Sequence, residues 1–235
     1  RGRYDAGYAE VSAARVQRLK AMGLVDPEWT PHPLVGDWDA VEHREWEIAC
    51  MEVYAAMVDC MDQGIGDIVK ALEEEGELDN TLLVYLQDNG GCAEPFGRGS
   101  NAKDIDGKTF EPLGKDGLQT KIWPPMQTRD GRPVRTGPGV IPGPADTFIA
   151  YGENWANVSN TPFTGYKHHS HEGGVSSPLI VHWPAGIESD REGALIRDPA
   201  HLIDLMATAV DLAGAEPQLV VPHQGVSLLP ALRGK

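Results

Sequence analysis

The chain has 235 residues, of which 41% are hydrophobic, and a formal net charge of -15 at pH 7. This apolar content is too high for a disordered chain, and no apolar run approaches the roughly 18 residues of a transmembrane helix. An acidic surface repels phosphate backbones, which argues against nucleic acid as a partner. The length suffices for one large domain or two small ones with a real core.

The three cysteines, Cys50, Cys60 and Cys92, contain no CxxC pair. Their number and spacing predict neither a disulfide framework nor a zinc site, and buried or incidental thiols are the simplest interpretation. The sequence begins with Arg1 rather than Met and has no signal-peptide pattern. It closes on Lys235, soon after a predicted helix and a loop, so we expect a fragment of a longer protein.

The N-terminal third of the chain predicts two helices. Residues 5–23 repeat apolar side chains at helical spacing. Residues 43–75 predict a longer helix, which Gly64 and Gly66 could bend or break. That helix carries an apolar stripe that we expect to pack in the core, comprising Trp46, Cys50, Val53, Met57, Met61, Ile65, Ile68 and Leu72.

A buried β-strand is predicted over residues 81–86, after a turn at Asp79 and Asn80. Its residues are mostly Leu and Val without clean alternation, which is typical of a strand covered on both faces in a parallel sheet. With the preceding long helix it forms the second half of a βαβ unit, so the predicted fold class is α/β. Residues 92–165 are rich in Gly and Pro with little periodicity, and we expect a long loop region that covers the site.

Regular structure is predicted again toward the C-terminus. Residues 178–184 predict a short buried strand, and residues 199–213 predict a helix that ends at Gly214. Residues 220–232 look like a loop and the start of another element. The formal glycosylation triplet Asn157-Val158-Ser159 is set aside, because such triplets are common by chance and nothing else indicates secretion.

The first candidate site is the run Asp88-Asn89-Gly90-Gly91, directly after the strand at residues 81–86. In open α/β sheets, ligands bind at the carboxyl ends of strands. Asp88 and Asn89 supply two oxygen ligands of the kind that calcium and magnesium prefer. An ordinary Asn-Gly turn with a capping Asp explains the same residues, because Asp, Asn and Gly dominate turns.

The second candidate site is the segment at residues 166–174, with one lysine and three histidines. Lys167 is a compact cation that can bind a sulfate or phosphate oxygen. A nearby His can donate a hydrogen bond or a proton to a leaving group. The histidines His168, His169 and His171 could instead form a transition-metal site, or the segment could be a solvated polar loop.

Several common motifs are absent from the sequence. It has no P-loop, no GxGxxG after a strand, no GxSxG elbow and no HExxH. This removes the usual nucleotide-binding, triad-hydrolase and zincin interpretations.

Short segments across almost the whole chain resemble the type I sulfatases of the bacterial arylsulfatase kind, within the alkaline-phosphatase-like superfamily. Each segment is weak alone, but together and in this order they are specific. They are Tyr4-Asp5-Ala6-Gly7-Tyr8, Asp62-Gln63-Gly64-Ile65-Gly66, Leu78-Asp79-Asn80-Thr81-Leu82, Asp88-Asn89-Gly90-Gly91, Tyr166-Lys167 through His171-Glu172-Gly173-Gly174, Pro178-Leu179-Ile180, Trp183-Pro184 and Gly225-Val226-Ser227-Leu228-Leu229-Pro230.

The resemblance implies a three-layer α/β/α sandwich of the alkaline-phosphatase-like kind, of which this chain is an incomplete C-terminal part. Residues 1–235 would form one partial sulfatase domain. Within it, residues 1–91 hold helices and the metal-site strand, residues 92–165 hold the active-site loops, and residues 166–235 hold the lysine segment, a strand and a helix. The implied activity is hydrolysis of small-molecule or saccharide sulfate esters, with calcium and a formylglycine nucleophile.

Residue by residue, the resemblance implies that Asp88 and Asn89 ligate calcium. Lys167 would contact the sulfate oxygen near the leaving group, as a catalytic and substrate-binding residue. His168 is grouped with it as substrate-binding, without an assigned chemical role. No role follows for His169, His171 or Glu172.

The chain departs from the family at the nucleophile. The formylglycine motif is Cys or Ser, any residue, Pro, any residue, Arg, and Cys92 has its Pro one position too late. We therefore expect the nucleophile upstream of Arg1 and no turnover by the chain alone. A phosphonate or phosphate ester hydrolase of the same superfamily, and a non-catalytic scaffold domain, remain alternatives. The compartment stays open between bacterial cytoplasm and periplasm, and so does the oligomeric state.

Overall fold

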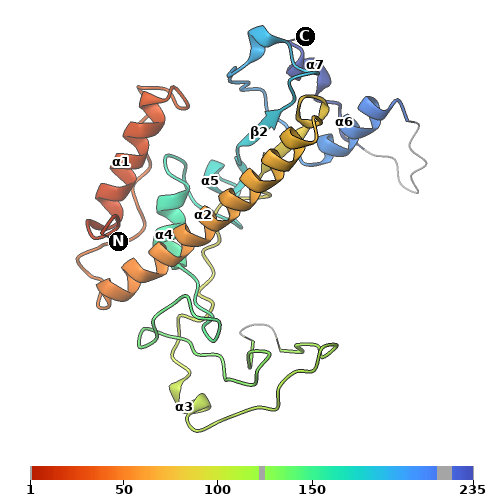
Figure 1. The fold of residues 1–235 in the computed structure, drawn as a ribbon. Coiled ribbons are helices and arrows are strands. Elements are labelled where there is room, and N and C mark those ends of the chain that lie inside the picture. Colours follow the sequence, from red (N-terminus) through yellow and green to blue (C-terminus); the bar gives the residue numbers. More distant parts are fainter. Residues whose placement is uncertain (1, 122–124, 216–223, 235) are drawn as a thin grey trace. The chain divides into compact units, whose positions relative to one another are not determined.

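The computed structural model describes residues 2–121, 125–215 and 224–234, and the chain divides into two compact units. Unit 1 comprises Arg1–Gln63 and Asn89–Ser177, and unit 2 comprises Gly64–Asp88 and Pro178–Lys235. In chain order (Figure 1) the elements are α1 (Gly7–Ala21), α2 (Arg44–Glu74), the 3₁₀ turn η1 (Leu78–Asn80), β1 (Leu83–Leu86), α3 (Ala102–Ile105), α4 (Gly152–Ser159), α5 (Glu172–Val175), β2 (Leu179–His182), the 3₁₀ turn η2 (Ser189–Arg191), α6 (Ile203–Ala213) and α7 (Leu229–Leu232).

The two long predicted helices are confirmed. α1 lies within the predicted residues 5–23, and α2 runs unbroken through Gly64 and Gly66. Both glycines are exposed and have open space around them, and glycine inside a helix lowers its stability relative to alanine. None of the helices in the described residues combines the length and the apolar character that a membrane span requires.

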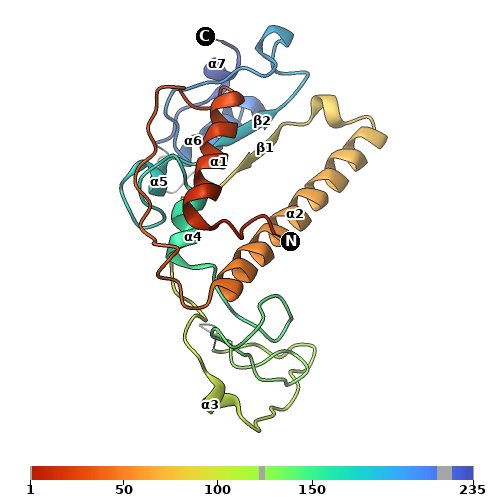
Figure 2. The ribbon, with the colours of Figure 1, turned by 90° about the vertical axis from the view of Figure 1, so that its left-hand side faces the viewer.

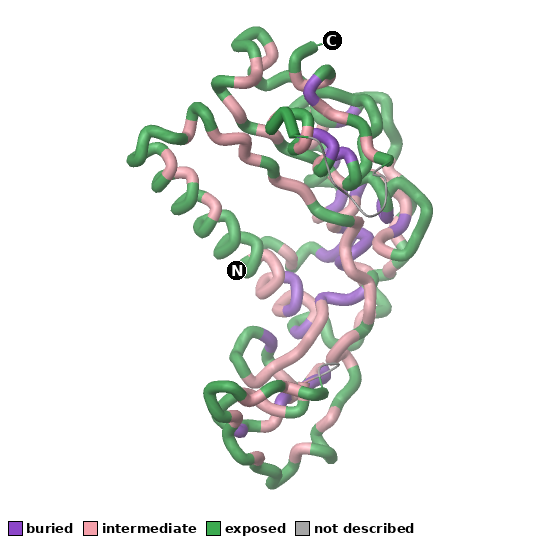
Figure 3. The backbone as a smooth tube through the Cα atoms, turned by 90° about the vertical axis from the view of Figure 1, so that its right-hand side faces the viewer, coloured by how far each residue is buried: buried purple, intermediate pink, exposed green. Residues whose placement is uncertain are grey.

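The apolar stripe of α2 is only partly buried, which corrects the expectation that it packs in the core along its length. Trp46, Cys50 and Met51 are buried at the N-terminal end. Farther along, Met57 is 65% exposed and Ile68 is 60% exposed, and Figure 3 shows most of this part of the helix as exposed. Helical periodicity identifies which face is apolar, but burial depends on what the rest of the chain places against that face.

The two predicted strands form, but they are neither parallel nor buried. β1 pairs antiparallel with β2 in a two-stranded sheet, with Leu83 opposite His182 and Leu86 opposite Leu179. Ile180 of β2 is 59% exposed. A strand buried on both faces needs neighbours and covering layers, and no further strand joins this sheet within the described residues.

In unit 2, an apolar groove separates one face of this sheet from α6 and α7. It encloses about 240 Å³ and is lined by the strand residues Leu82, Val84, Leu86, Leu179 and Val181 and by the helical and flanking residues Leu205, Thr208, Ala209, Leu228 and Leu232. Figure 2 shows the two strands alongside each other in this unit. The predicted C-terminal strand and helix, β2 and α6, therefore both line this groove.

The segment at residues 224–229 is fastened to α6 by two side chains. The carboxylate of Asp204 accepts from the backbone N–H of His201 at 2.7 Å and of Val226 at 2.9 Å. Thr208 Oγ1 accepts from the backbone N–H of Leu228 at 2.9 Å. The expected element after residue 220 is the short helix α7, and the start of that expected region (residues 220–223) lies outside the described residues.

The core of unit 1 surrounds Trp155 in α4, which is fully buried. Its ring makes edge contacts with Tyr8 of α1 at 4.7 Å and with Tyr4 at 5.6 Å between ring centroids. Its indole N–H donates to the backbone carbonyl of Glu47 in α2 at 3.0 Å. α1 and α4 pack together, as Figure 2 shows, so one tryptophan connects three helices of this unit.

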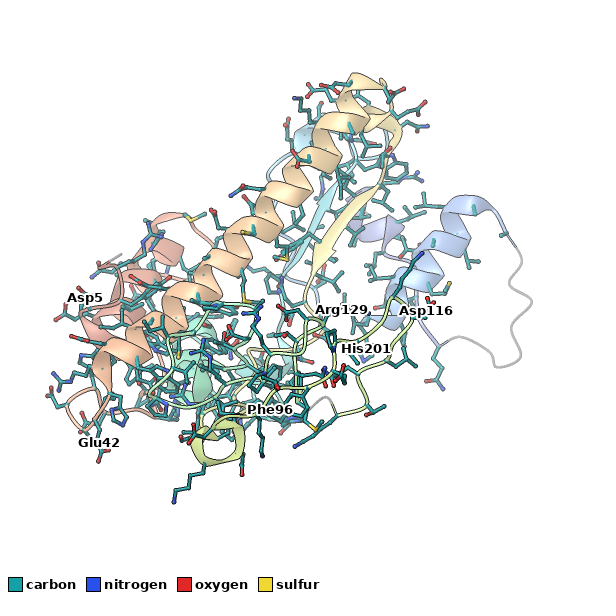
Figure 4. All side chains as sticks on the ribbon, turned by 60° about the horizontal axis from the view of Figure 1, so that its bottom comes forward. Asp5, Glu42, Phe96, Asp116, Arg129 and His201 are labelled. Carbon is teal, nitrogen blue, oxygen red and sulfur yellow. The ribbon has the colours of Figure 1, made fainter. Side chains whose placement is uncertain are left out.

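The region at residues 92–165 is mainly irregular, as predicted, but it contains the core helix α4. Its loops are held by hydrogen bonds. Asn101 binds the backbone of Val134 and Thr136 at 2.7 Å and 2.9 Å, and the N–H of Ala150 donates to the carbonyl of Phe96 at 2.8 Å. Figure 4 labels Phe96 among the crowded side chains of this region. Asn157, of the glycosylation triplet, is buried.

Candidate active site

The two segments singled out in the sequence lie side by side in unit 1. The backbone N–H of Gly90 donates to the carbonyl of Gly174 at 3.0 Å, and the N–H of Lys167 donates to the carbonyl of Gly91 at 3.0 Å. These bonds connect the segment at residues 89–91 with the segment at residues 166–174. The fold therefore brings Asn89 and Lys167 into the same neighbourhood.

Glycine is required where these segments cross. A Cβ on Gly90 would lie 1.8 Å from the carbonyl oxygen of Gly173, and a Cβ on Gly173 would lie 2.3 Å from that of Gly165. Real Cβ contacts are never this short, so a side chain at either position would force the backbones apart. Gly90 and Gly173 are thus explained by close backbone approach.

Asn160, at the end of α4, fixes the turn after Asn89. Its Oδ1 accepts from the N–H of Gly91 at 3.1 Å, and its Nδ2 donates to the carbonyl of Gly165 at 3.3 Å. One amide side chain therefore contacts the first segment and the residue directly before the second. Sequence reasoning missed Asn160, because a single Asn in a Gly- and Pro-rich stretch carries no local signal.

Glu94 gathers three side chains of the site around one carboxylate. The ammonium of Lys167 lies 2.9 Å from Oε1, and His168 Nε2 lies 3.0 Å from the same oxygen. The thiol of Cys92 donates to Oε2. These three bonds, that of Cys92 first, lower the pKa of Glu94 from its usual value to about 2. Glu94 is therefore an ionised carboxylate at neutral pH.

His168 has an unusual backbone conformation. Its φ is 75°, a left-handed value, and no other non-glycine residue in the described ranges has a positive φ. Such conformations concentrate at functional sites, where the surrounding structure maintains them. Here the turn lets Lys167 and its neighbour reach a single carboxylate oxygen.

The remaining polar residues of the lysine segment do not join this cluster. The ring of His169 packs against Tyr166 at 4.7 Å between centroids, and the rings of His169 and His171 are 5.9 Å apart. Glu172, in α5, accepts a hydrogen bond from Ser176 at 2.5 Å. The described residues contain no group of three or more His, Cys, Asp or Glu side chains that could hold a metal ion.

Asp88 and Asn89 are consecutive, but they fall in different units. Asp88 is exposed and makes no hydrogen bond or ion pair with another described residue. Asn89 donates from Nδ2 to the carbonyl of Gly90 at 2.8 Å, which leaves its Oδ1 available as an acceptor. Carboxylate and amide oxygens are the ligand types that hard cations prefer.

A polar cavity of about 270 Å³ lies beside Glu94, whose two neighbours Ala93 and Pro95 line it. Its wall includes the ion pair of Glu47 and Arg98, and the Arg98 guanidinium lies 4.6 Å above the Trp46 ring. Burial raises the pKa of Glu47, and Arg98 opposes that rise. The wall of the cavity therefore carries one positive and one negative side chain, whose charges offset each other.

Comparison with known proteins identifies the chain. The model of the sulfatase family matches residues 3–215. The chain belongs to the sulfatase family. The resemblance seen in the sequence is thereby confirmed.

Individual relatives within the sulfatase family extend well beyond this chain. An arylsulfatase of Klebsiella aerogenes is 32% identical over 240 residues, covering 97% of this chain and 45% of that protein. An uncharacterised sulfatase of Schizosaccharomyces pombe is 32% identical, with 96% of this chain and 36% of that protein covered. A steryl-sulfatase of Mus musculus is 27% identical, with 77% and 20% covered. The chain spans less than half the length of these curated relatives.

Proposed function

We propose that the protein containing this chain hydrolyses sulfate esters of the arylsulfatase type. Membership of the sulfatase family supports the reaction class. The proposed site rests on two backbone hydrogen bonds, which join the segment at residues 89–91 to the segment at residues 166–174. They bring the candidate metal ligand Asn89 and the candidate sulfate-binding Lys167 together.

In this proposal Asp88 and Asn89 are calcium ligands, and further ligands come from outside this chain. Lys167 contacts the sulfate oxygen near the leaving group, and His168 binds substrate beside it. Bound calcium would supply positive charge that stabilises the charge on the sulfate oxygens. Lys167 contributes a preorganised cation at the same group, which is the usual way that enzymes stabilise a transferring anionic group.

We further propose that this chain is part of one sulfatase domain with a three-layer α/β/α sandwich. The helices and the small sheet support an α/β class. The exposed apolar residues of α2 and of β2 would then be covered by sequence outside this chain. The formylglycine nucleophile is also proposed to lie there, because none of Cys50, Cys60 and Cys92 fits the motif.

The test compares an aryl sulfate with the matched aryl phosphonate, using the intact protein that contains this chain. We expect faster hydrolysis of the sulfate ester and no turnover by residues 1–235 alone. Faster hydrolysis of the phosphonate would assign the protein to the alternative chemistry. No hydrolysis of either ester, with calcium present, would favour a scaffold role.

A further inference from the structure

Glu94 binds three neighbouring side chains through both of its carboxylate oxygens. Oε2 accepts from the thiol of Cys92, two residues earlier in the chain. Oε1 accepts from Lys167 at 2.9 Å and lies 3.0 Å from His168 Nε2. One carboxylate therefore anchors two side chains that the proposed reaction uses.

The Glu94–Lys167 ion pair is partly buried, and the backbone beside it is held by a hydrogen bond. The Glu94 side chain is 22% exposed and that of Lys167 is 32% exposed, so their ion pair is partly screened from water. The main chain is fixed beside it, since the N–H of Lys167 donates to the carbonyl of Gly91 at 3.0 Å. A long, flexible lysine is thus held at its backbone and at its ammonium group.

The contact of the His168 ring with Glu94 accompanies an unusual backbone conformation. The His168 side chain is 69% exposed, so burial does not fix its orientation. Its left-handed φ of 75° accompanies a direct contact between the ring and Glu94. A strained backbone persists when surrounding contacts determine it, and the carboxylate is such a contact.

We propose that Glu94 is a positioning residue, whose carboxylate orients the Lys167 ammonium and the His168 ring toward the sulfate group. This inference rests on the proposed function, because it assigns those two side chains to substrate. Glu94 itself touches neither substrate nor metal in this scheme. An anion that stays ionised at neutral pH suits this task, because it holds both donors in every turnover.

The test uses Glu94→Gln, which keeps the shape but removes the charge, and Glu94→Asp, which keeps the charge. Glu172→Gln is the matched control, because Glu172 lies in the same region and binds only Ser176 among the described residues. Thermal unfolding of each variant confirms that it is folded. Two measurements follow on the intact protein, kcat and KM for an aryl sulfate, and acylation of each lysine by a small reagent, read by mass spectrometry.

We expect Glu94→Gln to lower kcat by about 100-fold, as small misplacements of catalytic groups do, with a smaller change in KM. Lys167 should acylate several times faster relative to the other lysines, because its ammonium is released from the ion pair. Glu94→Asp should restore part of both properties, and Glu172→Gln should match the wild type.

The two measurements separate the two proposals. Unchanged acylation of Lys167 in Glu94→Gln overturns the positioning role, and so does faster acylation with unchanged kcat. A wild-type protein that hydrolyses no sulfate ester overturns the proposed function. In that case the acylation measurement still decides whether Glu94 holds Lys167.

Discussion

The backbone N–H of Gly90 binds the carbonyl oxygen of Gly174 at 3.0 Å. This bond joins two glycine pairs that are far apart in the sequence. It leaves no space for a side chain on Gly90, where a Cβ would lie 1.8 Å from the carbonyl oxygen of Gly173. The geometry of the site therefore depends on these residues having no side chain.

Gly90→Ala should destabilise the protein by at least about 2 kcal/mol, because the methyl group forces the two segments apart. Urea denaturation measures the loss. Gly66→Ala is the control, since this glycine lies within α2 with nothing within 4 Å. That change should stabilise the protein by up to about 1 kcal/mol. Equal effects at both positions would contradict the close approach.

Trp155→Ala should cost about 3–5 kcal/mol, because it leaves a cavity where a fully buried ring stood. The loss includes the hydrogen bond from its indole to the carbonyl of Glu47. Trp29→Ala removes a side chain that is 44% exposed and should cost much less. Thermal unfolding of the two variants checks the difference, and a similar cost for both would argue against a core centred on Trp155.

The stabilisation from Glu94 should depend on pH. Its pKa falls from 4.5 to about 2 on folding, mainly through the bonds from Cys92 and Lys167. A lowered carboxyl pKa stabilises the fold above the unfolded value, and this stabilisation is lost as pH falls toward the folded value. Wild type should therefore exceed Glu94→Gln in stability at pH 7, and the gap should close between about pH 4.5 and pH 2. Urea midpoints across this range provide the measurement, and a constant gap would refute the assignment.

Asp88→Asn and Asn89→Ala should each weaken calcium binding by the intact protein by at least about tenfold, with a matching loss of sulfate ester hydrolysis. Both changes remove an oxygen ligand or its charge. Asp62→Asn, at an exposed position of α2, is the control for loss of a negative charge. Calorimetric titration with calcium gives the affinities. An affinity unchanged in both site variants would remove the metal assignment.

Local pattern was enough to predict the three longest helices of the described residues. The periodicity at residues 5–23 and 43–75 matches α1 and α2 to within a few residues, and α6 lies within the predicted residues 199–213. The strands were also located, as β1 and β2. Their burial was predicted wrongly, because it depends on covering layers rather than on the strand's own residues.

The site was predictable only in part. Asn89 and Lys167 stood out by residue type and by family resemblance, and the hydrogen bonds that connect their segments agree with that choice. Glu94 and α4 were missed, because neither has a signal in its local sequence. Two of the three partners of Glu94, Lys167 and His168, are brought to it only in the folded chain. α4 is 8 residues long, too short for periodicity to identify within a Gly- and Pro-rich stretch.

Most tryptophans of this protein lie in the unit whose core surrounds Trp155, so its tryptophan fluorescence reports mainly on that unit. By sequence, unit 1 contains five of the six tryptophans, Trp29, Trp38, Trp46, Trp123 and Trp155, and unit 2 contains Trp183. A fully buried indole emits at shorter wavelength than one in water, so melting of unit 1 should shift the fluorescence strongly to the red. An emission trace of this protein would follow its aromatic core and largely miss the small sheet.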